Sequence, residues 1–395
     1  MGIRRGYWQI PIETHMTSRE RLLTTLAGRR PDRVPVAPFV QEEYLSFYYP
    51  HKTSLDRVLD AVELANELDF DLMAKHRALE RPHFLRRSYP NWELRQAEAR
   101  EDGMIRRRIE IVTPGRTLVR EESGPESGAA TSGVHFMVTR PLLADSADVE
   151  AFLKYLPPLG EEDRREMREI AARWRTIIGE RGVLAPWGFA GVFNFCADLR
   201  GLDNIYIAPY ANESEYRALM DTVTQAMVEY CLALGETAIE CVGIQGHIAG
   251  GATTGPDFFR EFVQPYEKRV IDAIHAGGKF SVYHNCGCAR KLYPNYHELG
   301  MTVWETVSEP PRGDNRLADA KAALGDRICL LGNLDQVDFL KRAMPSEVAE
   351  KTREIVGIGK PGGRFIFSTS DYLEHSTPRE NVVAMIEAAK EAGRY

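Results

Sequence analysis

Eight short apolar or β-branched runs alternate with long helical patterns, and this alternation constrains the fold more than any other feature of the chain. Strands are predicted at residues 34–40, 70–74, 182–187, 238–245, 279–284, 302–307, 327–332 and 364–368. Helices are predicted at residues 55–68, 162–178, 213–234, 256–276, 288–299, 316–324, 345–356 and 378–392. Such alternation is typical of a parallel sheet covered by helices. Eight units predict an α/β fold, a (β/α)8 TIM barrel, with a doubly wound open sheet as the alternative.

The alternation stops between the second and third predicted strands. Residues 105–122 have the pattern of a β-hairpin around Thr113-Pro114-Gly115, which is a turn signal. We therefore predict a single barrel over residues 17–395, with a hairpin-containing insertion after strand two at about residues 76–160. Residues 1–16 are predicted to form an N-terminal arm. Two roles are open for it, namely contact with a second subunit in a homodimer, or disorder.

Composition excludes several classes of function. The 395 residues include 50 Lys and Arg against 57 Asp and Glu, a net charge of -7, which is not the basic footprint of a nucleic-acid-binding or membrane-surface protein. The six cysteines do not form the framework of a small secreted protein. Neither a secretory leader nor a run of roughly 20 apolar residues is present. We predict a cytoplasmic protein whose partners are small molecules or proteins, with no nucleic acid and no membrane.

Polar residues gather where the predicted strands end, which is where TIM barrels carry their active sites. The residues selected on this basis are Trp187, Asn194, Gln245, His247, His284, Cys286, Glu305, Asn333 and Asp371. The carboxyl ends of parallel strands meet at one edge of the sheet, so we expect these side chains to share one site.

His284 and Cys286 form the sharpest motif of this set. Alternate side chains of an extended strand share a face, so the imidazole and the thiolate can reach one ion. Zinc accepts both ligands, and a catalytic zinc usually takes three ligands from the protein. The alternative is an interior histidine beside a buried, inert thiol. His247, Glu305 and Asp371 are the candidates for a third ligand.

A series of motifs resembles the signatures of the uroporphyrinogen decarboxylase superfamily. They are MTSRERLL (16–23), RPDRVPV (30–36), TPGRTL (113–118), FFREF (258–262) with Pro265-Tyr266, HNCG (284–287), GNLD (332–335) and TPREN (377–381). In this order they span nearly the whole chain after its first 16 residues. They are specific for the superfamily, whereas they do not distinguish one activity within it.

Within the superfamily, the chain resembles the corrinoid-linked methyltransferases more than the true decarboxylases. The decarboxylases carry an Arg-Gln-Ala-Gly-Arg segment after the first strand and a Gly-His-Gly segment after the last. This chain has Gln41-Glu42-Glu43-Tyr44 and Ser370-Asp371-Tyr372 at those places. Carboxylates there would repel a polyanionic tetrapyrrole. The resemblance therefore disfavours porphyrinogen decarboxylation.

The same methyltransferases hold zinc by a His-x-Cys pair after strand five and by a further cysteine after the last strand. His284 and Cys286 match the pair residue for residue. The further cysteine is missing, because Asp371 stands at or next to its aligned position. Three interpretations are open: Asp371 is an oxygen ligand, the metal is bound differently, or no metal is bound.

The resemblance implies a corrinoid-dependent methyltransferase. It would move a methyl group between a small methylated substrate, for example an aryl methyl ether, and a corrinoid supplied by a partner protein, with zinc as Lewis acid. Predicted catalytic residues are Glu305, Asp371 and His247, predicted metal ligands are His284 and Cys286, and predicted substrate-binding residues are Gln245, Asn333, Trp187 and Asn194. Two alternatives stay open: a decarboxylase-like lyase that acts on a small carboxylic acid without metal, and a non-catalytic corrinoid-binding barrel.

Overall fold

The computed structural model describes residues 15–52, 56–75, 79, 81–126, 136–186 and 191–395, and its centre is a parallel sheet. Five strands form this sheet in the order β11-β10-β9-β8-β7. They are β7 (Cys241–Gln245), β8 (Phe280–His284), β9 (Val303–Glu305), β10 (Cys329–Leu334) and β11 (Phe365–Thr369). A second parallel pair joins β1 (Leu72–Ala74) to β6 (Gly182–Leu184). Each of these seven strands falls on a predicted one, so the α/β class is confirmed.

The first predicted strand, residues 34–40, is wrong as a strand, because it is reduced to a single bridge between Val36 and Phe367. Pro35 and Pro38 explain this, since proline has no N–H to donate to a ladder. The segment still lies between two strands. Phe367 N donates to Pro35 O at 2.9 Å and Asp71 N donates to Val36 O at 2.8 Å, which ties it to β11 and to the start of β1.

Further backbone hydrogen bonds connect β6 to the other edge of the five-stranded sheet. Glu240 N donates to Leu184 O at 3.2 Å, and Gly243 N donates to Pro186 O at 2.9 Å. Backbone pairing therefore runs from β11 through residues 35–37, β1 and β6 to β7.

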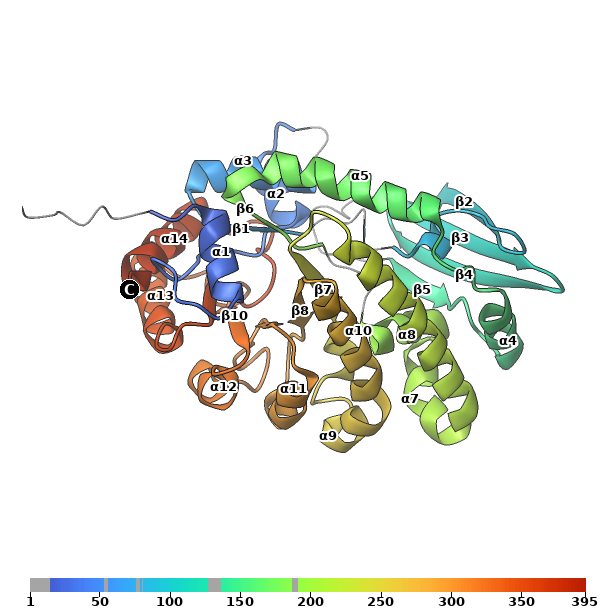
Figure 1. Ribbon diagram of the computed structural model, residues 1–395. Helices are drawn as coiled ribbons and strands as arrows, with labels where there is room; N and C mark the ends of the chain where they lie inside the picture. The colour runs from blue at the N-terminus through green and yellow to red at the C-terminus, as the bar shows by residue number, and fades with distance from the viewer. Residues whose placement is uncertain (1–14, 53–55, 76–78, 80, 127–135, 187–190) are drawn as a thin grey trace, which may run out of the picture.

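Helices lie around the outside of the parallel strands (Figure 1). They include α1 (Ser18–Leu26), α2 (Glu42–Tyr48), α3 (Arg57–Leu68), α5 (Glu161–Ile178), α6 (Val192–Arg200), α7 (Leu202–Ala211), α8 (Glu213–Gly235), α9 (Gly255–Phe258), α10 (Gln264–Ala276), α11 (Tyr293–Leu299), α12 (Leu317–Leu324), α13 (Pro345–Gly359) and α14 (Arg379–Gly393). Every predicted helix overlaps one of these. In α5 the buried Met167, Ala171, Trp174 and Ile178 recur every three or four residues, so one face of the helix packs on the core. Among the described residues, no helix combines the length and apolarity needed to cross a bilayer.

A separate antiparallel sheet lies between β1 and β6 along the chain, at the right of Figure 1. Its strands, in the order β2-β3-β4-β5, are β2 (Glu93–Glu101), β3 (Met104–Thr113), β4 (Arg116–Pro125) and β5 (Met137–Arg140), and α4 (Ser146–Tyr155) follows. β3 and β4 form the hairpin expected around Pro114-Gly115. β2 was not predicted because its side chains are almost all exposed, so it lacks apolar alternation.

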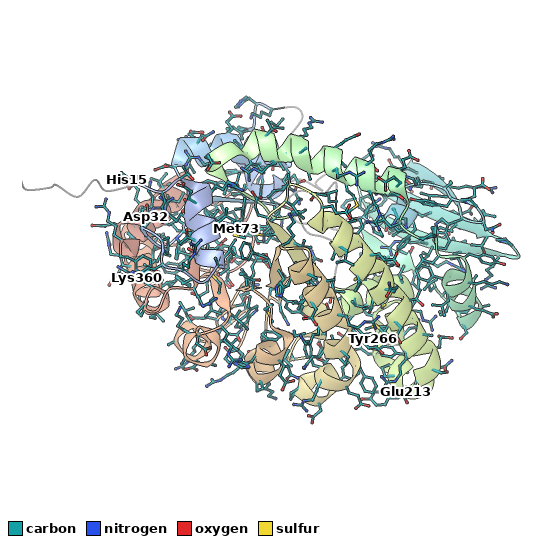
Figure 2. All side chains as sticks on the ribbon, viewed as in Figure 1. His15, Asp32, Met73, Glu213, Tyr266 and Lys360 are labelled. Carbon is teal, nitrogen blue, oxygen red and sulfur yellow. The ribbon has the colours of Figure 1, made fainter. Side chains whose placement is uncertain are left out.

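A buried carboxylate, Asp71, ties the N-terminal helix to the parallel strands. It is 0% exposed and accepts from Arg21 Nη1 at 2.6 Å, from Arg33 Nη1 at 2.7 Å and from Val36 N at 2.8 Å. Arg21 Nε also donates to Asp32 at 2.7 Å, and Asp32 is labelled beside α1 in Figure 2. The RPDRVPV motif thus stabilises the fold, because its polar residues connect α1 to the start of β1.

Candidate metal centre

His284 ends β8, and its imidazole lies between two carboxylates. Nδ1 is 3.1 Å from Oε2 of Glu305, and Nε2 is 3.9 Å from Oδ2 of Asp371. The parallel register pairs His284 with Glu305 across β8 and β9, which brings the first pair together. Asp371 follows β11. The three side chains therefore meet at the carboxyl ends of the strands, where a TIM-type site is expected.

His284, Cys286 and Asp371 each bring one ligand atom into a group whose atoms all lie within 4.8 Å of one another. An imidazole nitrogen, a thiolate sulfur and a carboxylate oxygen are all zinc ligands, and three protein ligands leave one position for substrate. Cys286 and Asp371 are only half-buried, so the group is reachable from the mouth. The donor set therefore fits a catalytic zinc.

The carboxylate of Asp371 is held in place by its own loop. Its Oδ1 accepts from Tyr372 N at 2.8 Å, and its backbone N donates to Oε1 of Gln336 at 3.1 Å. Because Oδ1 is engaged, Oδ2 is the oxygen that faces His284. Of the three candidates for a third ligand, only Asp371 belongs to the group.

Glu305 and Lys75 form a buried layer behind His284. Glu305 is 1% exposed, and its Oε1 accepts from Lys75 Nζ at 2.5 Å while its Oε2 faces His284 Nδ1. The ammonium of Lys75 also lies 3.3 Å from the centroid of the Phe39 ring. A carboxylate in this position fixes the imidazole proton on Nδ1 and directs Nε2 toward the candidate metal site. Glu305 thus orients His284, a candidate metal ligand.

For Glu305 and His284 the neighbouring charges overcome the effect of burial, whereas burial lowers the pKa of Lys75 despite the charge of Glu305. Burial raises the pKa of Glu305, but Lys75 and His284 together lower that pKa below its usual value. Burial lowers the pKa of His284, whereas the hydrogen bonds to Cys286 and Glu305 and the charge of Asp371 raise it above its usual value. Glu305 is therefore ionised at neutral pH, as an acceptor for the imidazole N–H must be.

Lys75 was missed by the sequence analysis. It directly follows the second predicted strand, in the position where TIM-barrel site residues lie, and this was the available signal. Lysine does not ligate zinc in the usual sites, so its role became visible only through its contact with Glu305.

His247 opens the short 3-10 turn after β7 (His247–Ala249), beside the metal group but outside it. Its ring meets that of His284 edge to face, with 6.1 Å between centroids. Asn194 Nδ2 donates to His247 Nδ1 at 3.2 Å, and Asn194 Oδ1 accepts from Ile248 N at 3.2 Å. Desolvation in the mouth and the charge of His284 lower the pKa of His247. Asn194 thus holds the turn that carries a neutral His247.

Two further predicted residues lie at the same edge of the sheet. Gln245 ends β7 and pairs with His284 in the register. Asn333 lies in β10, two residues beyond the Leu331 that pairs with Glu305. Its Nδ2 donates to Val307 O at 3.3 Å, and its buried Oδ1 has no hydrogen-bond partner among the described residues. Trp187, the remaining prediction, lies outside the described residues.

Comparisons with known proteins place these features in a family context. The family model described as uroporphyrinogen decarboxylase (URO-D) matches residues 144–392. The methylcobamide:CoM methyltransferase MtaA of Methanosarcina barkeri is 24% identical over 389 residues, 96% of this chain and 99% of that protein. The chain is also similar to the methylcobamide:CoM methyltransferase MtbA of Methanosarcina acetivorans, with 24% identity over 183 residues. That match covers 46% of this chain and only 50% of the relative's length.

A uroporphyrinogen decarboxylase from Serratia proteamaculans is also similar, 23% identical over 256 residues, which are 62% of this chain and 67% of that enzyme. Among solved structures, a methyltransferase from Methanosarcina mazei superposes with a TM-score of 0.66 at 17% identity, covering 95% of this chain and 99% of that one. At this identity the structural likeness concerns the fold.

Proposed function

This chain belongs to the uroporphyrinogen decarboxylase (URO-D) family, and from that premise we propose that it is a corrinoid-linked methyltransferase of the family. It moves a methyl group between a small methylated compound, such as an aryl methyl ether, and a corrinoid carried by a partner protein. The observation that carries the proposal is the group of His284, Cys286 and Asp371 at the carboxyl ends of the strands. The end-to-end match to a methylcobamide:CoM methyltransferase supports it.

The proposal includes a closed (β/α)8 barrel over residues 17–395, with residues 76–160 as an insertion and residues 1–16 as an arm. Backbone pairing that links both edges of the five-stranded sheet supports closure. Closure matters for function because it brings the ends of β1, β7, β8, β9 and β11 around one mouth.

Zinc is the metal that this donor set suits, and the chemistry it supplies when bound is Lewis acidity toward the heteroatom that carries or receives the methyl group. His284 Nε2, Cys286 Sγ and an Asp371 oxygen would hold it. Glu305 keeps the imidazole proton on Nδ1, and Lys75 keeps Glu305 ionised. These two residues act on the ligand His284.

Residues around the metal group bind and orient the substrate in this proposal. His247 accepts a hydrogen bond at Nδ1, so its own proton stands on Nε2 and can be donated to a heteroatom in the mouth. The amides of Gln245 and Asn333 position the substrate. The buried Oδ1 of Asn333, which has no hydrogen-bond partner among the described residues, is available as an acceptor. Asn194 fixes the turn of His247.

Metal analysis combined with a transfer assay tests the proposal. We expect about one zinc per chain in the purified protein, because three protein ligands hold one catalytic ion. His284→Ala and Cys286→Ala should lose both the bound zinc and the methyl-transfer activity. The activity is measured as transfer from aryl methyl ethers to reduced cobalamin, monitored by the absorbance of the cobalamin. Cys288→Ala is the matched control, since Cys288 lies two residues away and outside the metal group. A metal-free protein with full transfer activity would overturn the zinc assignment and favour a metal-independent lyase or binding role.

A further inference from the structure

We propose that Asn315 and Ser308, in the loop that follows β9, are positioning residues that fix the spacing of Cys286 and Asp371 before any metal is bound. The inference rests on the proposed function, which it deepens by naming what preforms the metal group. His284 belongs to a strand, so the sheet itself holds it. Cys286 and Asp371 belong to the loops after β8 and β11, and in the order of the sheet β9 and β10 stand between those strands. The spacing of these two loops therefore needs a support of its own.

The two neighbours of Cys286 in the chain are each bonded to the β9 unit. On one side, Asn285 N donates to Glu305 O at 2.8 Å. On the other side, Gly287 O accepts from Nδ2 of Asn315 at 2.9 Å. Because the residue before Cys286 and the residue after it are both fixed, the path of the backbone at Cys286 is set by β9 and its loop.

Asn315 is 0% exposed and uses both of its amide protons on backbone carbonyls. Besides the bond to Gly287, its Nδ2 donates to Ser308 O at 2.9 Å, while its Oδ1 accepts from Tyr293 OH at 3.1 Å. The two loops approach closely here, since a Cβ added at Gly313 would lie 2.3 Å from Ser308 O and 2.5 Å from Gly287 O. The amide of Asn315 thus joins the Cys286 loop to the loop after β9.

Ser308 joins the loop after β9 to the loop that carries Asp371. Its Oγ accepts at 2.8 Å from Oγ of Ser370, the residue before Asp371. The same Oγ lies 2.8 Å from Oγ1 of Thr306, which can accept the proton of Ser308. Thr306, Ser308 and Ser370 are 0%, 2% and 5% exposed, so bulk water does not compete for these bonds.

The path of hydrogen bonds therefore runs without a break from the residue after Cys286 to the residue before Asp371. Val307, inside this path, has a φ of 57°, a conformation that β-branched residues rarely adopt. Such a conformation persists where the surrounding contacts determine it. The loop after β9 is thus a spacer that keeps the two proposed ligands within the 4.8 Å spanned by the metal group. A preformed site binds its ion more tightly, because binding does not have to order two loops.

Cobalt(II) binding to the metal-free full chain tests the spacer, because the absorption of bound cobalt depends on its ligands. We expect Asn315→Ala and Ser308→Ala each to bind cobalt about tenfold to a hundredfold more weakly than the wild type, as is usual when the support of a metal ligand is lost. Asn315→Ala should also lose sulfur-to-cobalt charge-transfer absorption, since it releases the Cys286 loop. Ser308→Ala should keep that absorption, because its effect falls on the loop of Asp371.

Asn295→Ala is the matched control. Asn295 is a buried amide on the neighbouring α11, 1% exposed, and its Nδ2 donates to Oε1 of Gln264 at 2.8 Å. This variant should lose stability to unfolding much as Asn315→Ala does, because each removes a buried amide. Its cobalt affinity and its cobalt spectrum should stay at the wild-type values, which separates positioning of the ligands from stability of the fold.

Alkylation of Cys286 by iodoacetamide in the metal-free chain, followed by mass spectrometry, gives a second readout that needs no metal. We expect it to be at least about threefold faster in Asn315→Ala than in the wild type, because local opening exposes the thiol. Asn295→Ala should react at the wild-type rate.

Two results would overturn the spacer: equal alkylation rates in Asn315→Ala and the wild type, or cobalt affinities of Asn315→Ala and Ser308→Ala that match that of Asn295→Ala. Failure of the proposed function is distinguishable. Faster alkylation in Asn315→Ala, in a protein that neither binds metal nor transfers methyl groups, would retain the spacer and remove the function. Methyl transfer and metal binding that are unaffected by both variants would do the reverse.

Discussion

Lys75 and Glu305 stand 230 positions apart in the chain, yet their charged groups meet at 2.5 Å inside the protein. Lys75 is 5% exposed and Glu305 is 1% exposed, so neither charge is solvated by bulk water. The second oxygen of Glu305 faces His284, the proposed zinc ligand. A buried ion pair thus stands directly behind the proposed metal site and couples the end of β1 to the ends of β8 and β9.

Lys75→Met is expected to weaken zinc binding. Without the ammonium, Glu305 loses its ionic partner and holds the imidazole of His284 less firmly. Loss of such a partner typically costs about tenfold to a hundredfold in metal affinity. Competition with a chromogenic chelator measures the change, and Lys351→Met on the surface of α13 serves as the control.

Because Lys75→Met also breaks a buried pair, Glu305→Gln is the second variant to measure. Its amide oxygen can still accept from His284 Nδ1, so it should bind zinc more tightly than Glu305→Ala. Wild-type zinc affinity in both Lys75→Met and Glu305→Ala would show that the buried pair serves stability alone.

Asp371→Cys is expected to bind zinc more tightly than the wild type. A thiolate is a softer ligand than a carboxylate and would restore the second cysteine that the resemblance implies, so a gain of about tenfold or more is expected. Asp371→Ala should bind zinc more weakly. Cobalt substitution gives a second readout, because each added thiolate increases the sulfur-to-cobalt charge-transfer absorption. Equal affinities of wild type and Asp371→Ala would exclude Asp371 as a ligand.

The sequence predicted the regular parts of this structure well because their signals are local. Apolar runs identified seven strands, and the motif at His284 and Cys286 identified two members of the metal group. Residues 34–40 failed as a strand because Pro35 and Pro38 remove the donors of a ladder. The choice of Asp371 over His247 and Glu305 required the positions of three loops, which no local pattern contains.

The buried partners were less predictable than the metal group itself. Lys75 is meaningful only beside Glu305, and Asn194 acts on His247 from α6 instead of from a strand end. Such pairs join residues that are far apart in the chain. A single sequence shows which residue types stand at strand ends, whereas their pairing depends on the register and on the packing of neighbouring units.

Asp71→Asn is expected to destabilise the fold while sparing the metal group. The variant removes the charge that Arg21 and Arg33 share. Breaking a buried ion pair typically costs about 3–5 kcal/mol in the free energy of unfolding, and the remaining pair of Arg21 with Asp32 should keep the loss at the lower end of this range. Urea unfolding measures this loss. Asp326→Asn at the surface is the control and should change stability little. Zinc content should stay at the wild-type value, and a parallel loss of zinc would contradict the separation of anchor and site.

The buried carboxyl group of Glu267 predicts how the stability of the fold depends on pH. This residue of α10 is fully buried, and its Oε1 accepts from Phe193 N at 3.2 Å at the start of α6, the helix that carries Asn194. Its Oε2 is buried without a hydrogen-bond partner among the described residues. Burial raises the pKa of Glu267 from 4.5 to about 8, although the backbone N–H groups of Phe193 and Val192 oppose the rise. The folded protein therefore keeps this carboxyl protonated where the unfolded chain ionises it.

From this difference in pKa, Glu267 should make stability fall as pH rises from about 4.5 to about 8, since the unfolded chain then binds fewer protons than the folded one. Above about 8 both states are ionised and the loss is complete. Glu267→Gln keeps an acceptor for Phe193 N but does not titrate. Its melting temperature relative to the wild type should therefore rise steadily between pH 5 and pH 8, by an amount that corresponds to about a few kcal/mol. Glu350→Gln, on the exposed face of α13, is the control and should show a difference that does not depend on pH. If the difference between Glu267→Gln and the wild type is equally flat, Glu267 is ionised in the folded protein throughout this range.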